Sequence, residues 1–253
     1  MRDWGLVPGK WYIPGSPSPD IIMAIAEHLE QIHCRIAAAA IQAGRSPADV
    51  RLVAVSKTRP AADVSAAFQA GQIIFGENYV QELNAKAPLV QEPVEWHFIG
   101  HLQSNKVRQI AGLVTVIHSV DRLSLAEEIS RQWAKLGKVC DVLIQVNVAC
   151  EATKSGTTEE GALELVRAIS GLPGLRVRGL MTMPPFFDDP EAARPYFREL
   201  KRLAGLIASQ EIPGVEMNEL SMGMSGDFEA AIQEGSTLVR VGTAIFGERR
   251  YTE

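Results

Sequence analysis

One lysine lies where its amine could take part in covalent chemistry. Residues 51–60, RLVAVSKTRP, contain a valine-rich apolar run that is typical of a strand buried on both faces, and Lys57 follows it directly. Two interpretations are open. The side chain could lay its stem on the core and keep its ammonium in water. Alternatively, it could supply a desolvated amine kept for chemistry.

Residues suited to an anion lie near the other end of the sequence. Residues 222–227, MGMSGD, precede a helical stretch, and small residues there let backbone N–H groups approach a ligand at a helix N-terminus. A second loop follows Arg240. Ser225, Gly242 and Thr243 can together offer two hydroxyls and a close backbone N–H. Each loop alone could be a tight turn with a capping serine, but the pair predicts a phosphate site.

The elements that must position these residues follow an alternating pattern. Eight short apolar segments are predicted as strands: 52–56, 73–75, 96–99, 114–119, 142–148, 177–181, 219–222 and 238–246. Helical stretches are predicted between them, including 61–70, 81–90, 123–136, 158–170, 191–209 and 227–233. Such alternation indicates parallel βα units, and eight units in roughly 230 residues match a closed (β/α)8 TIM-type barrel.

A doubly wound open sheet is the alternative α/β fold. The sequence lacks the G-x-G-x-x-G signature after its first predicted strand, and it lacks a Walker loop. No linker divides residues 21–253, which we expect to form one domain. An extra helix over 19–44, with Asp20 as its cap, precedes the barrel. Residues 1–20 are predicted to be a flexible tail, and Met23 is a possible alternative start.

Composition excludes several classes of function. A net charge of −5 offers no basic field for nucleic acid or an anionic membrane, and the apolar runs are too short to span a bilayer. Cys34, Cys140 and Cys150 fit no metal or disulfide spacing and are predicted to be reduced core thiols in a cytoplasmic protein. His97 is expected to be a core histidine, and no metal site is expected between it and His101.

The barrel prediction brings the two ends of the sequence together. Strand C-termini form the active face of such barrels, so Lys57 should face the loops after strands seven and eight. Pyridoxal 5′-phosphate fits both features. Its aldehyde forms a Schiff base with a lysine, and its phosphate docks on N–H groups and hydroxyls.

Several motifs, in this order, resemble the pyridoxal phosphate homeostasis protein family. They are AVSKT, FGENYVQE, WHFIGHLQSNK, HSVDR, RGLMTM and the block 220–247, and together they extend from about Ile22 to Gly247. The resemblance implies a barrel like the N-terminal domain of alanine racemases, with pyridoxal phosphate on Lys57. It also implies that Ser225, Gly242 and Thr243 hold the phosphate and that Arg240 faces the pyridine nitrogen.

Two of these assignments have alternatives. Arg240 could instead form an ion pair at the barrel rim. Asn78, at the end of the second predicted strand, could bond to the cofactor ring oxygen or to a neighbouring group.

The resemblance implies a role in intracellular vitamin B6 and amino/keto-acid homeostasis, with pyridoxal-phosphate-dependent apoenzymes as candidate recipients. A low-activity amino-acid racemase or lyase is the enzymatic alternative, and a protein-interaction module with a structural lysine is the third. Only six residues follow Gly247, which leaves no room for the second domain of the racemases. We therefore expect a cofactor-binding protein rather than an enzyme, and a monomer.

Overall fold

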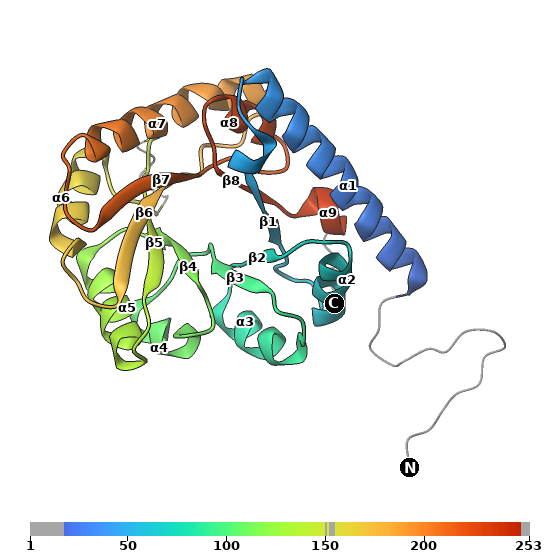
Figure 1. Cartoon of the computed structure of the whole chain (residues 1–253), viewed down its shortest axis with the longest axis horizontal. Helices are drawn as coiled ribbons and strands as arrows, with labels where there is room; N and C mark the ends of the chain where they lie inside the picture. Colours follow the sequence, from blue (N-terminus) through green and yellow to red (C-terminus); the bar gives the residue numbers. More distant parts are fainter. Residues whose placement is uncertain (1–17, 150, 152–154, 249–253) are drawn as a thin grey trace, which may run out of the picture.

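Eight parallel strands form a closed barrel in the part of the chain that the structure describes. The structure is a computed structural model that describes residues 18–149, 151 and 155–248. Each strand pairs with the next along the sequence, and β8 pairs with β1 (Figure 1). The strands are β1 (Arg51–Val55), β2 (Ile74–Glu77), β3 (Glu95–Phe98), β4 (Val116–Val120), β5 (Cys140–Gln145), β6 (Leu175–Met181), β7 (Val215–Ser221) and β8 (Leu238–Val241). The predicted barrel is confirmed, and the open sheet is wrong.

Helices surround this barrel. They are α2 (Ala61–Gln69), α3 (Val80–Lys86), α4 (Val107–Ile110), α5 (Leu123–Lys135), α6 (Glu159–Ile169), α7 (Arg194–Ala208), α8 (Phe228–Gln233) and α9 (Thr243–Phe246). Short 3-10 helices lie at Pro47–Asp49, Ala87–Leu89, Ser104–Lys106 and Pro190–Ala193. The long helices bury an apolar stripe against the strands, whereas α8 and α9 are only six and four residues long.

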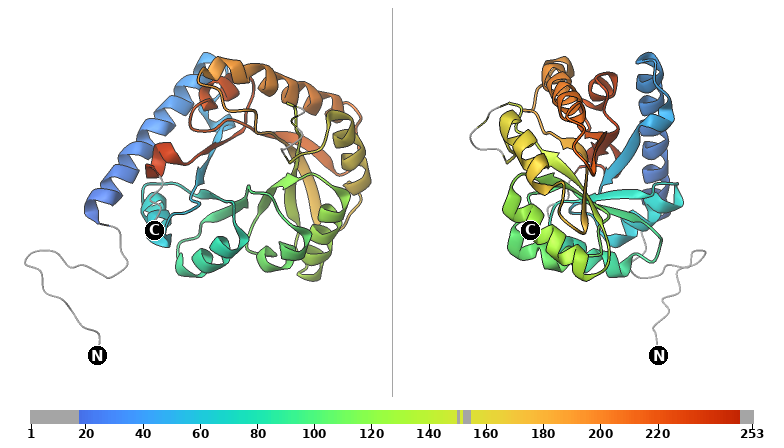
Figure 2. Two further views of the ribbon diagram at one scale, coloured as in Figure 1. Left: turned by 180° about the vertical axis from the view of Figure 1, so that it is seen from behind. Right: turned by 60° about the vertical axis from the view of Figure 1, so that its left-hand side comes forward.

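The predicted extra helix is present as α1 (Pro19–Gln42), which packs outside the ring against α2, α8 and α9 (Figures 1 and 2). Its cap is Ser18 rather than the predicted Asp20. The Ser18 hydroxyl accepts a hydrogen bond from the backbone N–H of Ile21, and Pro19, at the first helical position, has no N–H that would need an acceptor there. Of the predicted tail over residues 1–20, residues 1–17 lie outside the described part.

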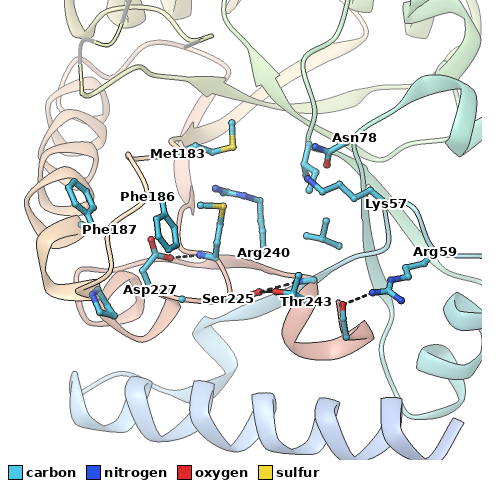
Figure 3. A pocket seen from close by; sticks show the side chains of 18 residues that line it. Lys57, Arg59, Asn78, Met183, Phe186, Phe187, Ser225, Asp227, Arg240 and Thr243 are labelled. Atoms are coloured by element: carbon cyan, nitrogen blue, oxygen red, sulfur yellow. Dashed lines mark hydrogen bonds between the residues drawn. The ribbon is translucent and has the colours of Figure 1, made fainter. Parts of the chain in front are cut away.

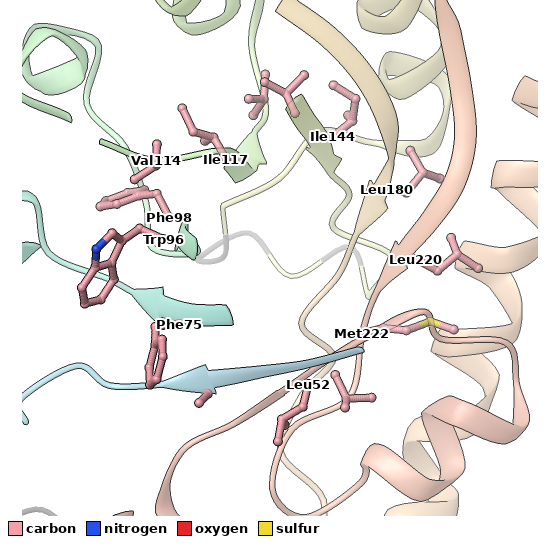
Figure 4. Close-up of a cluster of buried hydrophobic side chains, with 14 of the residues drawn as sticks. Leu52, Phe75, Trp96, Phe98, Val114, Ile117, Ile144, Leu180, Leu220 and Met222 are labelled. Carbon is pink, nitrogen blue, oxygen red and sulfur yellow. The ribbon is translucent and has the colours of Figure 1, made fainter. Parts of the chain in front are cut away.

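Alternation along each strand separates two cores. Side chains such as Leu52, Phe75 and Trp96 face outward and pack beneath the helices (Figure 4). Their strand neighbours face inward, where a smaller apolar cluster fills the barrel. Its members are Val53, Ile74, Leu143, Met181 and Leu238. Burial on both faces explains why the strands read as continuous apolar runs.

The eighth strand is shorter than predicted. It ends at Val241, and residues 243–246 form α9 rather than continuing the strand. Gly242 breaks the extended backbone with φ −124° and ψ −70°. An apolar run of nine residues does not by its period distinguish one strand from a strand followed by a helical turn.

Two other observations bear on the composition. Cys140 is buried as predicted, but Cys34 is exposed on α1, so it is not a core thiol; Cys150 lies outside the described residues. Among the helices that the structure describes, none has the length and apolar character needed to cross a membrane.

Candidate functional site

A cavity of about 440 Å³ lies at the C-terminal ends of the strands (Figure 3). All six predicted site residues, Lys57, Asn78, Ser225, Arg240, Gly242 and Thr243, contribute to its wall. The other lining residues are Val55, Arg59, Ile99, Met183, Phe186, Phe187, Pro190, Ala193, Met224, Gly226, Asp227 and Gly247. Residues separated by nearly 200 positions therefore face one space because the barrel closes β8 onto β1.

Lys57 lies in the turn that follows β1, and its side chain is half-buried. The next residue, Thr58, has a left-handed backbone with φ 63°, which is uncommon for a β-branched residue. Such a conformation persists only where the surroundings determine it. Hydrogen bonds to Ser56 and Thr58, the two neighbours of Lys57, provide this support.

A buried ionic cluster holds the residues that flank Lys57. The Lys86 ammonium donates to Glu77 Oε1 at 2.6 Å, to Glu82 Oε1 at 2.8 Å and to the Ser56 carbonyl at 2.7 Å. The Ser56 hydroxyl donates to Glu77 at 2.6 Å, and the Thr58 N–H donates to Glu82 at 2.5 Å. Burial raises the pKa of Glu77, and the adjacent Lys86 opposes that rise. The cluster fixes the backbone before and after the lysine.

Asn78 follows β2 and supplies an unsatisfied acceptor to the cavity wall. Its Oδ1 atom is buried and has no hydrogen-bond partner among the described residues. Gly100, in the loop after β3, packs directly on the Asn78 backbone. A Cβ at position 100 would lie 2.2 Å from the Asn78 carbonyl oxygen, so this contact requires glycine. Asn78 is thus held with a carbonyl available for a donor.

The two predicted phosphate loops meet. The Ser225 hydroxyl, after β7, accepts from the Gly242 N–H at 3.4 Å and from the Thr243 hydroxyl at 3.2 Å, after β8. A Cβ at Gly242 would lie 3.1 Å from the Val55 carbonyl oxygen, so its small size permits close approach to β1. Two hydroxyls and a backbone N–H therefore converge at one end of the cavity.

Arg240 forms part of the cavity wall, although it is almost fully buried. Its guanidinium donates to the Ser221 hydroxyl at 2.5 Å and to the Thr182 carbonyl at 2.9 Å. Burial lowers the pKa of Arg240 to about 10, and Asp227 opposes that shift. The side chain is therefore still charged at neutral pH. No carboxylate of the described residues forms a hydrogen bond or close ion pair with it; its hydrogen-bond partners are the Ser221 hydroxyl and the Thr182 carbonyl.

Sequence reasoning missed the apolar side of the cavity. Met183, Phe186 and Phe187 come from the loop after β6, and Phe187 stacks on Tyr196. Phe186 is 83% exposed at the mouth. The sequence PPFF, residues 184–187 in the loop after β6, was the available signal, because loops at strand C-termini build the active face.

The sequence predicted no metal pair between His97 and His101. The two side chains lie in different environments. His97 is fully buried and bonded to His118, as expected for a core histidine, whereas His101 contacts Ser155 at the surface. Among the described residues, no group of three or more His, Cys, Asp or Glu side chains could hold a metal ion.

Comparison with known proteins shows the class of domain to which the chain belongs. Residues 28–250 match the family described as alanine racemase, N-terminal domain. A curated relative from Aquifex aeolicus, named pyridoxal phosphate homeostasis protein, is 45% identical over 90% of this chain and 100% of its own length. A relative of the same name from Pseudomonas aeruginosa is 47% identical over 90% of this chain and 96% of its own.

A solved structure agrees with these relatives. PipY of Synechococcus elongatus, with PLP bound, superposes with a TM-score of 0.77 at 34% identity, covering 88% of this chain and all of PipY. The chain belongs to the pyridoxal phosphate homeostasis protein family, within the alanine racemase N-terminal domain class.

Proposed function

We propose that this protein binds pyridoxal 5′-phosphate in the cavity, as a Schiff base on Lys57, and serves in intracellular pyridoxal-phosphate and amino/keto-acid homeostasis. One observation carries the proposal: a lysine side chain and a cluster of hydroxyl and N–H groups line the same cavity. The names of the relatives, and the PLP bound to PipY, point to the same ligand.

The residues present fit the cofactor at each of its polar ends. Ser225, Gly242 and Thr243 would hold the phosphate by the hydroxyl and N–H groups that now contact one another. The unsatisfied Asn78 Oδ1 would accept a bond from the cofactor or from a neighbouring donor. Bound pyridoxal phosphate supplies an aldehyde for a lysine and an electron-withdrawing ring.

Arg240 would face the ring nitrogen, and its chemistry argues for storage rather than turnover. A guanidinium donates hydrogen bonds and has no acceptor, so it favours an unprotonated ring nitrogen and a weaker electron sink. The described part of the cavity wall contains no tyrosine or histidine that could act as a second base. These features weigh against the alternative of a low-activity racemase or lyase.

The remaining parts of the proposal concern where and with what the protein acts. A reversible Schiff base can be released to water or another amine, so apoenzymes that need pyridoxal phosphate are the proposed recipients. We propose a cytoplasmic monomer. Its net charge of −5 gives no attraction to nucleic acid or to an anionic membrane.

Borohydride reduction of the cofactor-saturated protein tests the covalent site. We expect a visible absorption band that is lost on reduction, with the added mass on the peptide that contains Lys57. Lys57→Ala should abolish the adduct, whereas Lys135→Ala, an exposed position on α5, should retain it. An unmodified Lys57 in a saturated sample would contradict the proposal.

A panel of D- and L-amino acids separates the two functional candidates. The loaded protein should change their chirality no faster than free pyridoxal phosphate does. Turnover well above that of the free cofactor, lost in Lys57→Ala, would favour the enzymatic alternative.

A further inference from the structure

A line of polar side chains crosses the barrel interior to Arg240. Glu95 Oε1 lies 3.1 Å from His97 Nε2, and His97 Nδ1 lies 2.9 Å from His118 Nε2. His118 Nδ1 lies 2.8 Å from the Ser221 hydroxyl, which also bonds to Arg240. We call Glu95, His97, His118 and Ser221 the histidine relay. Its members come from β3, β4 and β7.

The position of this relay is unusual for a barrel. Barrel interiors are filled mainly by branched apolar side chains. Here His97, His118 and Ser221 are fully buried within that interior, and none of them lines the cavity. Glu95 begins β3, at the opposite rim from the cavity, and its side chain is 34% exposed. The relay therefore links the outer rim to the cavity wall through groups that cofactor contact does not explain.

When both rings are neutral, the two ends of the relay fix the direction of every hydrogen bond. The Arg240 guanidinium can only donate, so the Ser221 oxygen accepts from it. At the other end, the ionised Glu95 carboxylate can only accept, and it also accepts from the Thr115 hydroxyl at 3.0 Å. His97 must then carry its proton on Nε2.

The interior bonds follow from this assignment. Neutral His97 accepts at Nδ1, so His118 donates from Nε2 and accepts at its own Nδ1. The Ser221 hydroxyl then donates its proton to His118, which leaves its oxygen lone pairs facing Arg240. One arrangement of protons satisfies all four contacts, and each group donates to the next from Arg240 to Glu95.

Burial keeps both rings neutral at neutral pH. Burial lowers the pKa of His97, which Glu95 and Glu219 oppose and Arg51 reinforces. Burial, with His97, Arg240 and Arg51, lowers the pKa of His118 well below its usual value. The hydrogen bond from His97 lowers the pKa of Glu95, which keeps the terminal acceptor ionised.

We propose that the histidine relay is a positioning device that orients the Ser221 hydroxyl as an acceptor and thereby holds the Arg240 guanidinium in the cavity wall. Glu95 at the far rim sets the proton arrangement of the whole relay. The part of this inference that concerns the cofactor rests on the proposed function. His97, His118 and Ser221 act through Arg240 and do not touch the ligand.

The proton arrangement can be measured without cofactor. Imidazole ¹⁵N spectra of the full-length apoprotein, which has five histidines, should show His97 and His118 as neutral Nε2–H tautomers at neutral pH. Glu95→Leu removes the terminal acceptor and should therefore remove the fixed tautomer of His97. Glu216→Leu, which removes a carboxylate bonded to Arg178 and not to a histidine, should not. A charged ring or an Nδ1–H tautomer in the wild type would overturn the relay.

The effect on Arg240 needs the loaded protein. His118→Phe and Glu95→Leu should each shift the visible band of bound pyridoxal phosphate and weaken its binding about fivefold, the size of one net hydrogen bond. His118→Gln should restore most of the loss, because its amide can donate to His97 and accept from Ser221. Glu95→Leu, at a partly exposed rim position, keeps the test decisive if His118→Phe does not fold.

The outcomes separate the two proposals. Unchanged spectra and affinity in both His118→Phe and Glu95→Leu would overturn the positioning role. A wild-type protein without a visible band would instead overturn the proposed function, and the apoprotein ring spectra would then decide the relay alone.

Discussion

Lys57 and Arg240 bring two cations of different kinds to one cavity. An ammonium can lose its proton and become a nucleophile, whereas a guanidinium whose pKa is about 10 keeps its proton at neutral pH. The first is suited to a covalent bond with an aldehyde, and the second to a fixed hydrogen bond. This difference is the chemical reason for proposing storage of the cofactor without strong activation.

Ser225→Ala tests the phosphate assignment at the scale of one side chain. The Ser225 hydroxyl joins the loops after β7 and β8, so its loss should remove a contact to the phosphate. We expect about tenfold weaker binding of pyridoxal phosphate, because hydrogen bonds to charged groups contribute roughly 1.5–3 kcal/mol. Titration of the apoprotein, followed by absorbance, measures the change.

The control for this experiment is Ser209→Ala, since the Ser209 hydroxyl donates to the Leu206 carbonyl of α7 and Ser209 does not line the cavity. Its affinity should equal that of the wild type. Equal affinities in Ser225→Ala and the wild type would remove Ser225 from the phosphate site.

The sequence predicted a cavity residue only where the residues immediately before it form a recognisable pattern. Lys57 directly follows an apolar run, so its position at the end of a strand could be read from spacing. The partners of Glu77 and His118 could not. Lys86 and Ser221 lie on other elements, and the contact from His118 to Ser221 joins residues 103 positions apart across a closed barrel.

At the scale of elements, the Lys57 turn depends on α3. The end of this helix delivers Lys86 into a cluster whose carboxylates hold Ser56 and Thr58. The left-handed conformation of Thr58 would otherwise be unfavourable. A helix that does not reach the cavity therefore sets the direction of the turn that does.

Lys86→Met should leave Glu77 buried without its counter-ion. Removing one partner of a buried ion pair costs roughly 3–5 kcal/mol, so the free energy of unfolding should fall by about that amount. Urea denaturation measures it. Combining Lys86→Met with Glu77→Gln should recover part of the loss, because the uncompensated charge is then gone.

Glu128→Gln provides the surface comparison. Glu128 pairs with Arg131 on the exposed face of α5, and such pairs contribute at most about 1 kcal/mol. A loss in Lys86→Met no larger than that in Glu128→Gln would show that the cluster does not support the turn.

Periodicity alone did not predict where two of the elements begin or end. The apolar run from Leu238 predicted one long strand, but Gly242 ends it, and Thr243 begins a helical turn at the cavity. The cap of α1 was placed two residues late for a related reason. Ser18 and Asp20 are both capping residue types, and only the backbone direction set by Pro19 distinguishes them.

At the scale of the whole molecule, the buried histidines predict how stability depends on pH. Burial lowers the pKa values of His97 and His118 in the folded state, so the unfolded chain binds protons at a higher pH than the folded one. Stability is fully present above about pH 6.5 and falls as the pH drops from there toward the folded-state values. Each histidine contributes a slope of at most about 1.4 kcal/mol per pH unit.

Chemical denaturation across this range measures the slope. Burial raises the pKa of Glu77, so its titration changes stability with pH in the opposite sense. Comparing a histidine variant with the wild type therefore isolates the histidine contribution better than the wild-type slope alone. His118→Gln should flatten the decline below about pH 6.5, whereas His101→Gln, at an exposed position, should not. Equal slopes in His118→Gln and the wild type would contradict the assignment.

The first described helix completes the last part of the barrel. α8 and α9 are too short to cover the outside of β8 and β1, and α1 lies there instead; its His28 contacts the Ile245 carbonyl at 2.9 Å. During synthesis on the ribosome, the apolar stripe of Ile25, Leu29, Ile32 and Ile36 therefore emerges some 200 residues before the surface that buries part of it. The nascent polypeptide therefore exposes this apolar surface through most of translation. For that reason we expect α1 to be a segment that a ribosome-associated chaperone would shield.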